Sequence, residues 1–517
     1  MNFYLTFSDG AKFADIARNI INGFGFVSGF NYFNPGVFIC DGLCEAINVP
    51  PVMPLAIAVF FKLFGVSDKS VIATSFFFFI LTIVFTYLLG KKLFGKAVGV
   101  FSALVIFINQ NFIDYATNGN SETLFMFEIV AIPYLMLLKK RWATISSFLL
   151  MVVCYFTRPQ AFIFIAGYML FYLLLNYKLK RAMFSFLGVV MLGFVIDRFI
   201  LIPLSGKYFI YSVTQRGIHA VTQITQHISF TDILRGLDSQ TFSPLLTIKK
   251  TFLNLFNFYR SLPNIVNPYL FVFFILSLLG VFKKREEKAF ISMTLFTTFL
   301  SFLFPAMTIP LYRYIHPVLP LVYIVGVASL VTIVNKILNF NFLIFKKFSI
   351  SKSFVVVGIS GLLIIFFVFI MQVGIFLHDY KYFKVRRNYG NPPVYVKLSK
   401  ILQENTNPND LVITNLDTWG TWYGERKTIW FPLKPSQLNI KGSSVIDAIY
   451  LTSFLMNDEN YYMGSEWKQI FENPENIENE FIRENFEFAG EFKVPASEVY
   501  EKYDSRAILL VRKQKKV

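Results

Sequence analysis

The chain has little of the charge that soluble proteins carry on their surfaces. Only 16% of its 517 residues are charged, whereas soluble domains average about a quarter. It holds 3 cysteines and 4 histidines, and no two histidines stand at metal-ligand spacing. A disulfide scaffold and a histidine metal centre are therefore not indicated. A glycine-rich nucleotide-binding fingerprint, a cleavable signal peptide and a fixed-period repeat are also absent from the sequence.

Apolar residues are abundant instead. Hydrophobic residues make up 55% of the chain, aromatic residues 18%, and phenylalanine alone accounts for 63 positions. A membrane-spanning helix needs roughly 20 predominantly apolar residues. The first three quarters therefore predict a mainly α-helical, polytopic membrane protein with about ten spans, at 71–90, 97–114, 122–138, 143–157, 161–177, 182–203, 266–282, 289–305, 315–337 and 354–376.

The charge distribution predicts the orientation of these spans. The net charge of +17 lies entirely in residues 1–377, which hold 30 basic and 13 acidic side chains, while 378–517 balance 19 against 19. The basic residues gather in alternate connections, at 91–96, 139–141, 178–181, 283–288 and 346–347. Lys and Arg favour cytoplasmic loops. We therefore attribute the excess of positive charge to cytoplasmic loops and not to nucleic-acid binding. The chain is predicted to be an integral protein of the plasma or inner membrane.

The remaining segments are predicted to lie outside. Residues 1–65 form a first external loop, with a helix lying on the membrane at 11–23 and an interfacial helix at 49–65 that is too short to span. Residues 204–265 form a long external loop, which we expect to line the acceptor side.

The last part of the chain differs in composition from the membrane part. In residues 378–517 charged residues return and apolar runs shorten. A helix precedes an Asn-Pro-Asn-Asp turn, and strand candidates follow at 411–415, "KTIWFP", "VIDAIYLT" and "RAILLVR". We predict a C-terminal external α/β domain.

Four charged residues from separate segments fall on the predicted outer face. They are Asp9, Glu122, Arg158 and Arg313. A carboxylate can take a proton from a hydroxyl nucleophile, and a guanidinium can hold phosphate oxygens. Taken singly, each has a simpler reading as a helix-start acid or as an arginine that reaches the lipid headgroups.

Other polar residues of the membrane part receive structural interpretations. Glu128 lies within a span, so we expect it to face the bundle interior. Asp197 and Arg198 are expected to pair with each other. Cys40 and Cys44 form either a small external disulfide or two free thiols.

The ordered motifs resemble those of lipid-carrier-dependent glycosyltransferases of the GT-C class. Within it, the chain is similar to glycosyltransferase family 39, the protein mannosyltransferases, and to the bacterial aminoarabinose transferases. The motifs are "SDGAKFADIARNIINGFGF", "VPPVMPLAIAVFFKLFGVS", "YLLGKKLFGKAVGVFSAL", "NGNSETLFM", "TRPQAF", "YRYIHPVLP" and "NLDTWGTWYGERKTIWFP". Their order and spacing carry the resemblance, which extends over nearly the whole chain.

The resemblance implies roles for individual residues. Asp9 is the catalytic base, and Glu122 supports it or the acceptor. Arg158 and Arg313 hold the phosphate of a polyprenyl-phosphate sugar donor, and Tyr312 and Tyr314, which flank Arg313, are substrate-binding residues. The acceptor is a protein, lipid or glycan hydroxyl, the product has an inverted anomeric centre, and no metal or other cofactor is required.

The chain departs from the family pattern at two places. The acidic motif is usually Asp-Glu, whereas here Gly10 follows Asp9; a divalent metal is therefore conceivable but has no support. The family also has a transmembrane helix ahead of this loop, and only eight residues precede Asp9. Either the start codon is assigned too late, or the fragment lacks its first helix; reading upstream of Met1 for an in-frame apolar stretch of about 20 codons tests this.

Two other classes of protein compete with a transferase. A flippase or transporter of polyprenyl-linked glycans also has many spans and inward charges, but such proteins place their charges at the bilayer midplane within repeated halves. A membrane scaffold without catalysis would not need Asp9.

Overall fold

The computed structural model describes most of the chain. The described residues are 4–32, 42–46, 49–176, 179–205, 209–210, 220–221, 243–280, 282–341, 352–386, 392–439, 445–454, 456, 463–496 and 504–513. Cys40, the basic pair at 346–347 and most of the predicted external loop 204–265 lie outside them.

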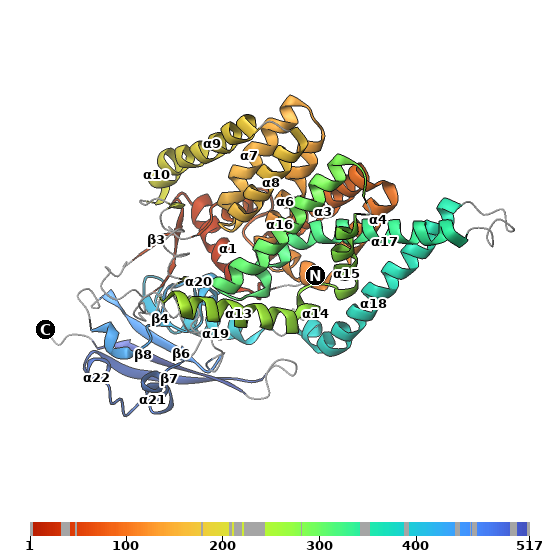
Figure 1. Cartoon of the computed structure of the whole chain (residues 1–517). Coiled ribbons are helices and arrows are strands. Elements are labelled where there is room, and N and C mark those ends of the chain that lie inside the picture. Colours follow the sequence, from red (N-terminus) through yellow and green to blue (C-terminus); the bar gives the residue numbers. More distant parts are fainter. Residues whose placement is uncertain are drawn as a thin grey trace.

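Helices dominate the first 386 residues, and a helix or helix pair coincides with each of the ten predicted ranges. The core is one continuous cluster of apolar side chains shared by these helices. Figure 1 shows the bundle, with α17 and α18 extending from it as a pair. The helices are α3 (Asp68–Phe94), α4 (Lys96–Phe107), α5 (Gln110–Ala116), α6 (Glu122–Leu137), α7 (Arg141–Thr157), α8 (Ala161–Asn176), α9 (Leu179–Ile196), η1 (Asp197–Leu201), α10 (Ile202–Ser205), α15 (Pro268–Leu276), η2 (Ser277–Leu279), α16 (Arg285–Met307), α17 (Leu319–Asn341) and α18 (Lys352–Arg386).

Fewer helices than ten are long enough to cross a bilayer unaided. Within the described residues, 5 helices have the length and apolar content of a span, or 6 if α4 and α5, which are bent by 66° at their junction, count as one broken span. Arg141–Thr157, Ala161–Leu175 and Pro268–Leu279 are apolar but shorter. The mainly helical membrane architecture is therefore confirmed, while the number of spans stays a prediction.

The predicted cytoplasmic connections meet at one end of the bundle. Lys139, after α6, forms an ion pair with Glu286 at the start of α16. Arg285 donates from Nε to the carbonyl oxygen of Leu174 near the end of α8, at 2.8 Å. Connections that the charge pattern assigns to one side of the membrane thus lie together.

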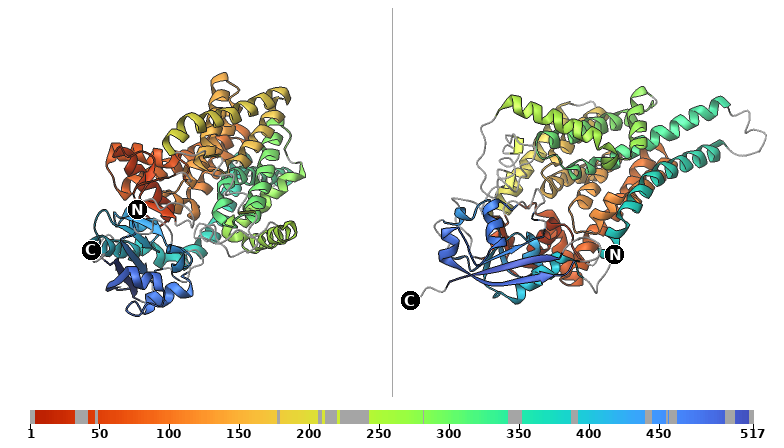
Figure 2. Two further views of the ribbon diagram at one scale, coloured as in Figure 1. Left: turned by 90° about the vertical axis from the view of Figure 1, so that its left-hand side faces the viewer. Right: turned by 90° about the horizontal axis from the view of Figure 1, so that it is seen from below.

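A mixed sheet occupies the C-terminal part and packs on the bundle (Figures 1 and 2). Its order is β2-β5-β4-β6-β8-β7. The four predicted strands correspond to β4 (Leu411–Thr414), β5 (Lys427–Trp430), β6 (Ala448–Thr452) and β8 (Ser505–Arg512), and β7 (Phe486–Val494) was not anticipated. The predicted helix before the turn is α19 (Val394–Glu404), and the short helices α20 (Thr418–Trp422), α21 (Ser465–Glu472) and α22 (Glu480–Asn485) complete this part.

The first external loop supplies an edge strand to this sheet. Its β2 (Phe30–Tyr32) pairs in parallel with β5, with Phe30 opposite Thr428. A two-stranded sheet of β1 (Val27–Ser28) and β3 (Cys44–Glu45) adjoins it. The carboxylate of buried Asp15 fixes this turn by accepting from Ser28 Oγ and Gly29 N, both at 2.9 Å. The α/β part therefore contains residues from both ends of the chain.

The helices of the first loop differ in how they meet their surroundings. In α1 (Ser8–Ile21) the apolar residues Phe13, Ile16 and Ala17 are buried, and the helix packs on α2 (Val52–Phe64) and α20. Its predicted position flat on the membrane is therefore wrong, because protein covers its apolar side. Helix α2 leaves Leu55, Val59 and other apolar side chains exposed along one side, as expected of an interfacial helix.

Helix α20 and Tyr423 fasten the segment that leads into Asp9. The Tyr423 hydroxyl donates to Asp68 Oδ2 and accepts from the Leu5 backbone N–H, both at 2.8 Å. Thr418 Oγ1 donates to the Ser8 carbonyl oxygen at 2.6 Å. These bonds join the C-terminal part, the start of α3 and the first loop, so the C-terminal motif fixes the backbone next to Asp9.

Arg426, the arginine of the "WYGER" motif, has a structural position. It is buried and donates from Nε to Thr406 Oγ1 at 2.9 Å and from Nη2 to the Thr406 carbonyl oxygen at 2.7 Å. Its guanidinium therefore holds the turn after α19 against the end of α20.

Two expectations about other polar residues have outcomes here. Asp197 and Arg198 do not pair with each other; the buried Asp197 carboxylate accepts from the backbone N–H groups of Phe209 and Ile210, at 2.9 and 3.0 Å. Main-chain donors thus replace the expected arginine. Cys44 is disulfide-bonded, and Cys154 is free and buried.

Replacing Tyr423 tests this anchoring. We expect Tyr423→Phe to cost about 1–3 kcal/mol of stability, because it leaves the buried Leu5 N–H without its acceptor and removes a hydrogen bond to a carboxylate. Hydrogen exchange measured by mass spectrometry should then rise across residues 4–10. Tyr450→Phe is the matched control, since that buried hydroxyl bonds Leu398 within the C-terminal part. Equal exchange at residues 4–10 in both variants would contradict the anchoring.

Candidate active site

Asp9 and Arg313, which are 304 residues apart, meet at the end of the bundle that faces the sheet. Asp9 lies in the first turn of α1, where the helix dipole favours a carboxylate. Arg313 lies in the short turn η3 (Tyr312–Tyr314) that precedes α17. Arg313 Nη1 is 2.7 Å from Asp9 Oδ2, and the two side chains are 28% and 43% exposed. This pair is therefore open to substrate.

Glu122 and Arg158 form a second pair that is buried. Glu122 is the first residue of α6, and Arg158 follows α7 with extended backbone. Arg158 Nη1 lies 2.6 Å from Glu122 Oε1 and 3.3 Å from Ser121 Oγ, and the two charged side chains are only 11% and 2% exposed. Burial makes this pair a fixed part of the site.

The ring of Tyr314 joins the two pairs. The guanidinium carbon of Arg158 lies 5.6 Å from the ring centroid, and that of Arg313 lies 5.5 Å from it. Both distances suit cation–π attraction. Tyr312, the other predicted tyrosine, instead contacts Phe258 of α13 (Pro244–Arg260), with ring centroids 6.1 Å apart. The structure thus brings five of the six predicted residues into one cluster, with Tyr312 at its margin.

The cluster keeps Asp9 ionised. Desolvation by the surrounding protein raises the pKa of its carboxyl, but Arg313, Arg158 and Lys12 together lower it below the ordinary value of 3.8. Asp9 is therefore a carboxylate at neutral pH and accepts a proton only from a group that is itself losing one. Lys12, one turn further along α1, was not among the predicted residues.

Gly10 lets the first loop approach the turn between α5 and α6. A Cβ atom at this position would lie 2.2 Å from the Asn118 carbonyl oxygen, and Gly119, at φ +73°, lies next to Gly10. The Asn118 side chain accepts a hydrogen bond from the Thr6 hydroxyl. The departure from the family's Asp-Glu motif thus has a steric reason, because a glutamate side chain does not fit at this position.

Three polar residues near the cluster were not predicted. Tyr115 and His316 are buried, and the Tyr115 hydroxyl lies 2.5 Å from His316 Nδ1. Asn120 is fully buried two residues before Glu122, and its side-chain amide has no hydrogen-bond partner within the described residues. Asn120 and His316 fall inside the quoted sequence motifs, so a search for every polar residue in them, and not for charged residues alone, would have found these two; Tyr115 lies outside the motifs.

Other acids stay apart from the cluster. Glu128 is fully buried and accepts from Thr157 Oγ1 at 2.7 Å, so its predicted position inside the bundle is confirmed. In the part of the chain that the structure describes, no three His, Cys, Asp or Glu side chains are grouped as metal ligands.

The fold is that of the GT-C class of membrane glycosyltransferases. The chain is similar to the structure of ArnT from Cupriavidus metallidurans bound to undecaprenyl phosphate, with 12% identity, a TM-score of 0.56 and coverage of 98% of this chain and 94% of the other. It is also similar to the oligosaccharyltransferase AglB from Archaeoglobus fulgidus, in complex with an inhibitory peptide and a dolichol-phosphate. That match has 15% identity, a TM-score of 0.53 and coverage of 89% and 67%.

Part of the sequence also matches a family model. Residues 48–200 match the model for dolichyl-phosphate-mannose-protein mannosyltransferases. None of the curated proteins matches the chain by sequence. The family model covers residues 48–200, and the solved structures, at 12% and 15% identity, share the fold that the resemblance of the motifs implied.

The two ion pairs are expected to differ in what they contribute to stability. Glu122→Gln should cost about 3 kcal/mol, because it leaves a guanidinium buried without its counter-charge. Asp9→Asn should cost about 1 kcal/mol or less, since that pair is partly solvated. Unfolding of the detergent-solubilised protein measures both.

Unfolding measurements also separate the effect of the Asp9–Arg313 ion pair on stability from other effects of the Asp9 side chain. In an Arg313→Gln background, Asp9→Asn should stabilise the protein, because desolvation of the carboxylate is then less compensated. A double-mutant cycle gives the coupling. Additive effects of Asp9→Asn and Arg313→Gln would show that the two side chains do not interact in solution.

Proposed function

We propose that this protein transfers a sugar from a polyprenyl-phosphate donor to a hydroxyl acceptor on the extracytoplasmic face of the membrane. The observation that carries this proposal is the cluster of Asp9 and two arginines around Tyr314. A base and two phosphate-binding cations at one end of a membrane bundle are what such a reaction needs. The solved relatives that hold undecaprenyl phosphate and dolichol-phosphate support the choice of donor.

The reaction follows as a single displacement. The Asp9 carboxylate takes the proton of the acceptor hydroxyl, and that oxygen forms a bond to the anomeric carbon. The bond between this carbon and the phosphate oxygen breaks, and the electron pair leaves with the polyprenyl phosphate. One attack from the face opposite the leaving group inverts the anomeric centre.

Arg313 has two anionic partners in this scheme. It pairs with Asp9 in the structure, and a donor phosphate competes for the same planar donor groups. As Arg313 turns to the phosphate, Asp9 loses a compensating charge and its pKa rises, which makes it a better base. Arg158, held by Glu122, supplies a second and stationary positive charge.

The location of the site supports a lipid-linked donor. The cluster lies where the bundle meets the sheet, at the side that the charge pattern assigns to the exterior. A polyprenyl tail can remain in the hydrocarbon while its phosphate meets Arg313. The basic connections lie together at another end of the bundle, around Lys139, Arg285 and Glu286.

Asp9→Asn tests the role of the carboxylate. In proteoliposomes supplied with radiolabelled polyprenyl-phosphate sugars and membrane acceptors, we expect release of polyprenyl phosphate to fall at least about 100-fold, the range for loss of a general base. Asp410→Asn, in a turn of the C-terminal part where the carboxylate caps Asn407, should keep the wild-type rate. Equal rates in wild type and Asp9→Asn would contradict the proposal.

The same vesicles distinguish transfer from flipping. Transfer consumes the donor, whereas a flippase moves intact donor to the other leaflet. A chelator added to the assay should leave the rate unchanged, since the proposed chemistry needs no metal. Intact donor crossing the bilayer, with no polyprenyl phosphate released, would assign the chain to the flippases.

A further inference from the structure

Helix α13 has two sides of opposite character. Its exposed side carries an apolar stripe at helical spacing, formed by Leu245, Ile248, Phe252, Phe256 and Tyr259, all more than half exposed. The helix is not among the candidate spans in the described part of the chain. An amphipathic helix with this pattern lies in the membrane interface with its apolar side in lipid, so α13 marks the level of the membrane surface.

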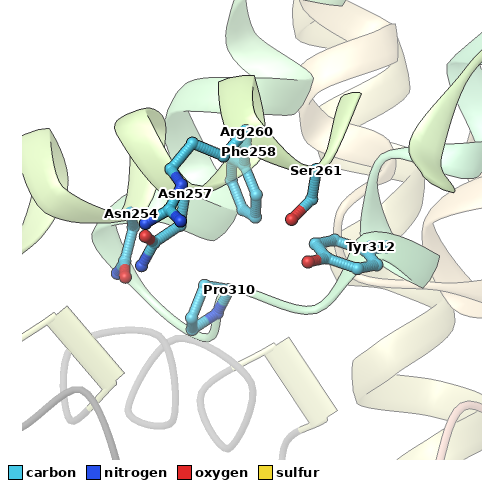
Figure 3. A pocket seen from close by; sticks show the side chains of 7 residues that line it. All are labelled: Asn254, Asn257, Phe258, Arg260, Ser261, Pro310 and Tyr312. Atoms are coloured by element: carbon cyan, nitrogen blue, oxygen red, sulfur yellow. The ribbon is translucent and has the colours of Figure 1, made fainter. Parts of the chain in front are cut away.

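The opposite side of α13 forms a polar pocket. Asn254 and Phe258 on this side are buried. A cavity of about 430 Å³ lies here, and its lining is Asn254, Asn257, Phe258, Arg260, Ser261, Pro310 and Tyr312. Figure 3 shows the amides of the two asparagines and the hydroxyl groups of Ser261 and Tyr312 around one space, with Pro310 below it.

The lining has the chemistry of a glycan site with one positive charge. Amides and hydroxyl groups can donate to and accept from sugar hydroxyls, and Phe258 and Tyr312 supply aromatic surface. Among the residues that the structure describes, Arg260 makes no hydrogen bond or ion pair, and none of those that line the pocket is acidic. Its guanidinium is therefore available to a carboxylate or phosphate of a ligand.

The pocket adjoins the reacting cluster through Tyr312. This residue lines the pocket and precedes Arg313, whose Nη1 contacts Asp9. Asn254 Nδ2 donates to the Ala306 carbonyl oxygen at 2.9 Å, which ties α13 to the end of α16 in front of the arginine turn. The pocket is thus next to the residue that pairs with Asp9, which is the side from which an acceptor would reach the proposed base.

We propose that this pocket is the acceptor subsite and that it takes a glycan carrying an anionic group, which Arg260 binds. The inference rests on the proposed function, because that function makes the neighbouring cluster the place of transfer. It narrows the acceptor from protein, lipid or glycan to an acidic glycan held at the membrane surface.

Ligand binding tests the pocket without any need for catalysis. The probes are a disaccharide with one hexuronic acid, its uncharged methyl ester, and the acidic disaccharide joined to an alkyl chain. They are titrated into the full chain in nanodiscs. We expect Arg260→Gln to weaken binding of both acidic probes about tenfold, as for loss of a charge-assisted bond, and to leave the methyl ester unchanged. Tighter binding of the alkyl form identifies a lipid-anchored glycan, and equal binding a free one.

Lys249→Gln is the matched control, since it removes a positive charge from the same helix outside the pocket. It should bind both acidic probes as the wild type does. Equal effects of Arg260→Gln and Lys249→Gln would overturn the proposal, and so would equal affinity of the acidic and esterified probes, or Arg260-dependent binding of a Ser/Thr peptide instead.

The result of the probe-binding test can be distinguished from the result of the donor assay that tests the proposed function. Asp9→Asn removes transfer in the donor assay but should leave probe binding intact, because Asp9 does not line the pocket. Failure of the donor assay with Arg260-dependent probe binding rejects the transferase reaction and keeps the glycan site. Normal donor turnover without such binding rejects the pocket alone.

Discussion

The site depends on an ion pair between two residues that are 304 positions apart in the chain. Asp9 and Arg313 come from segments that have no local reason to meet, and each carries a charge that is costly to place near hydrocarbon. Their pairing offsets that cost for both. Because Tyr314 also contacts Arg158, the pair is joined to a second pair, and four charges from four segments form a balanced group. No single segment holds this arrangement, so the bundle must assemble before the site exists.

The first loop cannot supply the required rigidity alone. Its helix α1 packs on α20 as well as on α2, so part of its cover comes from the C-terminal part. The C-terminal part compensates by taking β2 into its sheet and by bonding the backbone at Leu5 and Ser8, on the near side of Asp9. The α/β part therefore acts as a support for Asp9. Its Tyr395, Trp419 and Trp422 side chains are buried in one cluster with residues of the loop.

Periodicity and charge predicted which segments form helices and strands better than they predicted which segments pack against one another. Ten apolar ranges became helices because apolar length is a local property, and four strands were found from alternating β-branched and aromatic residues. Strand β2 was missed because three residues carry no pattern, and its pairing with β5 joins segments about 400 residues apart. The position of α1 was mistaken for the same reason: an amphipathic helix looks alike whether membrane or protein covers it. The pairing of Asp197 with backbone groups was also beyond reach of the sequence, since it depends on how the chain returns at 209–210.

The candidate site shows where sequence reasoning stops. Residue types and motif order identified the four charged residues. Only the assembled bundle shows that one ion pair is buried and the other is partly exposed to solvent. Glu122 and Arg158 are enclosed, so exchanging either partner for a substrate would leave a charge uncompensated in a low dielectric. Asp9 and Arg313 are partly solvated, and water can cover an exchange of partners there. In the proposed reaction, the arginine that releases a carboxylate and takes a phosphate is therefore Arg313, while Arg158 keeps its place beside Glu122.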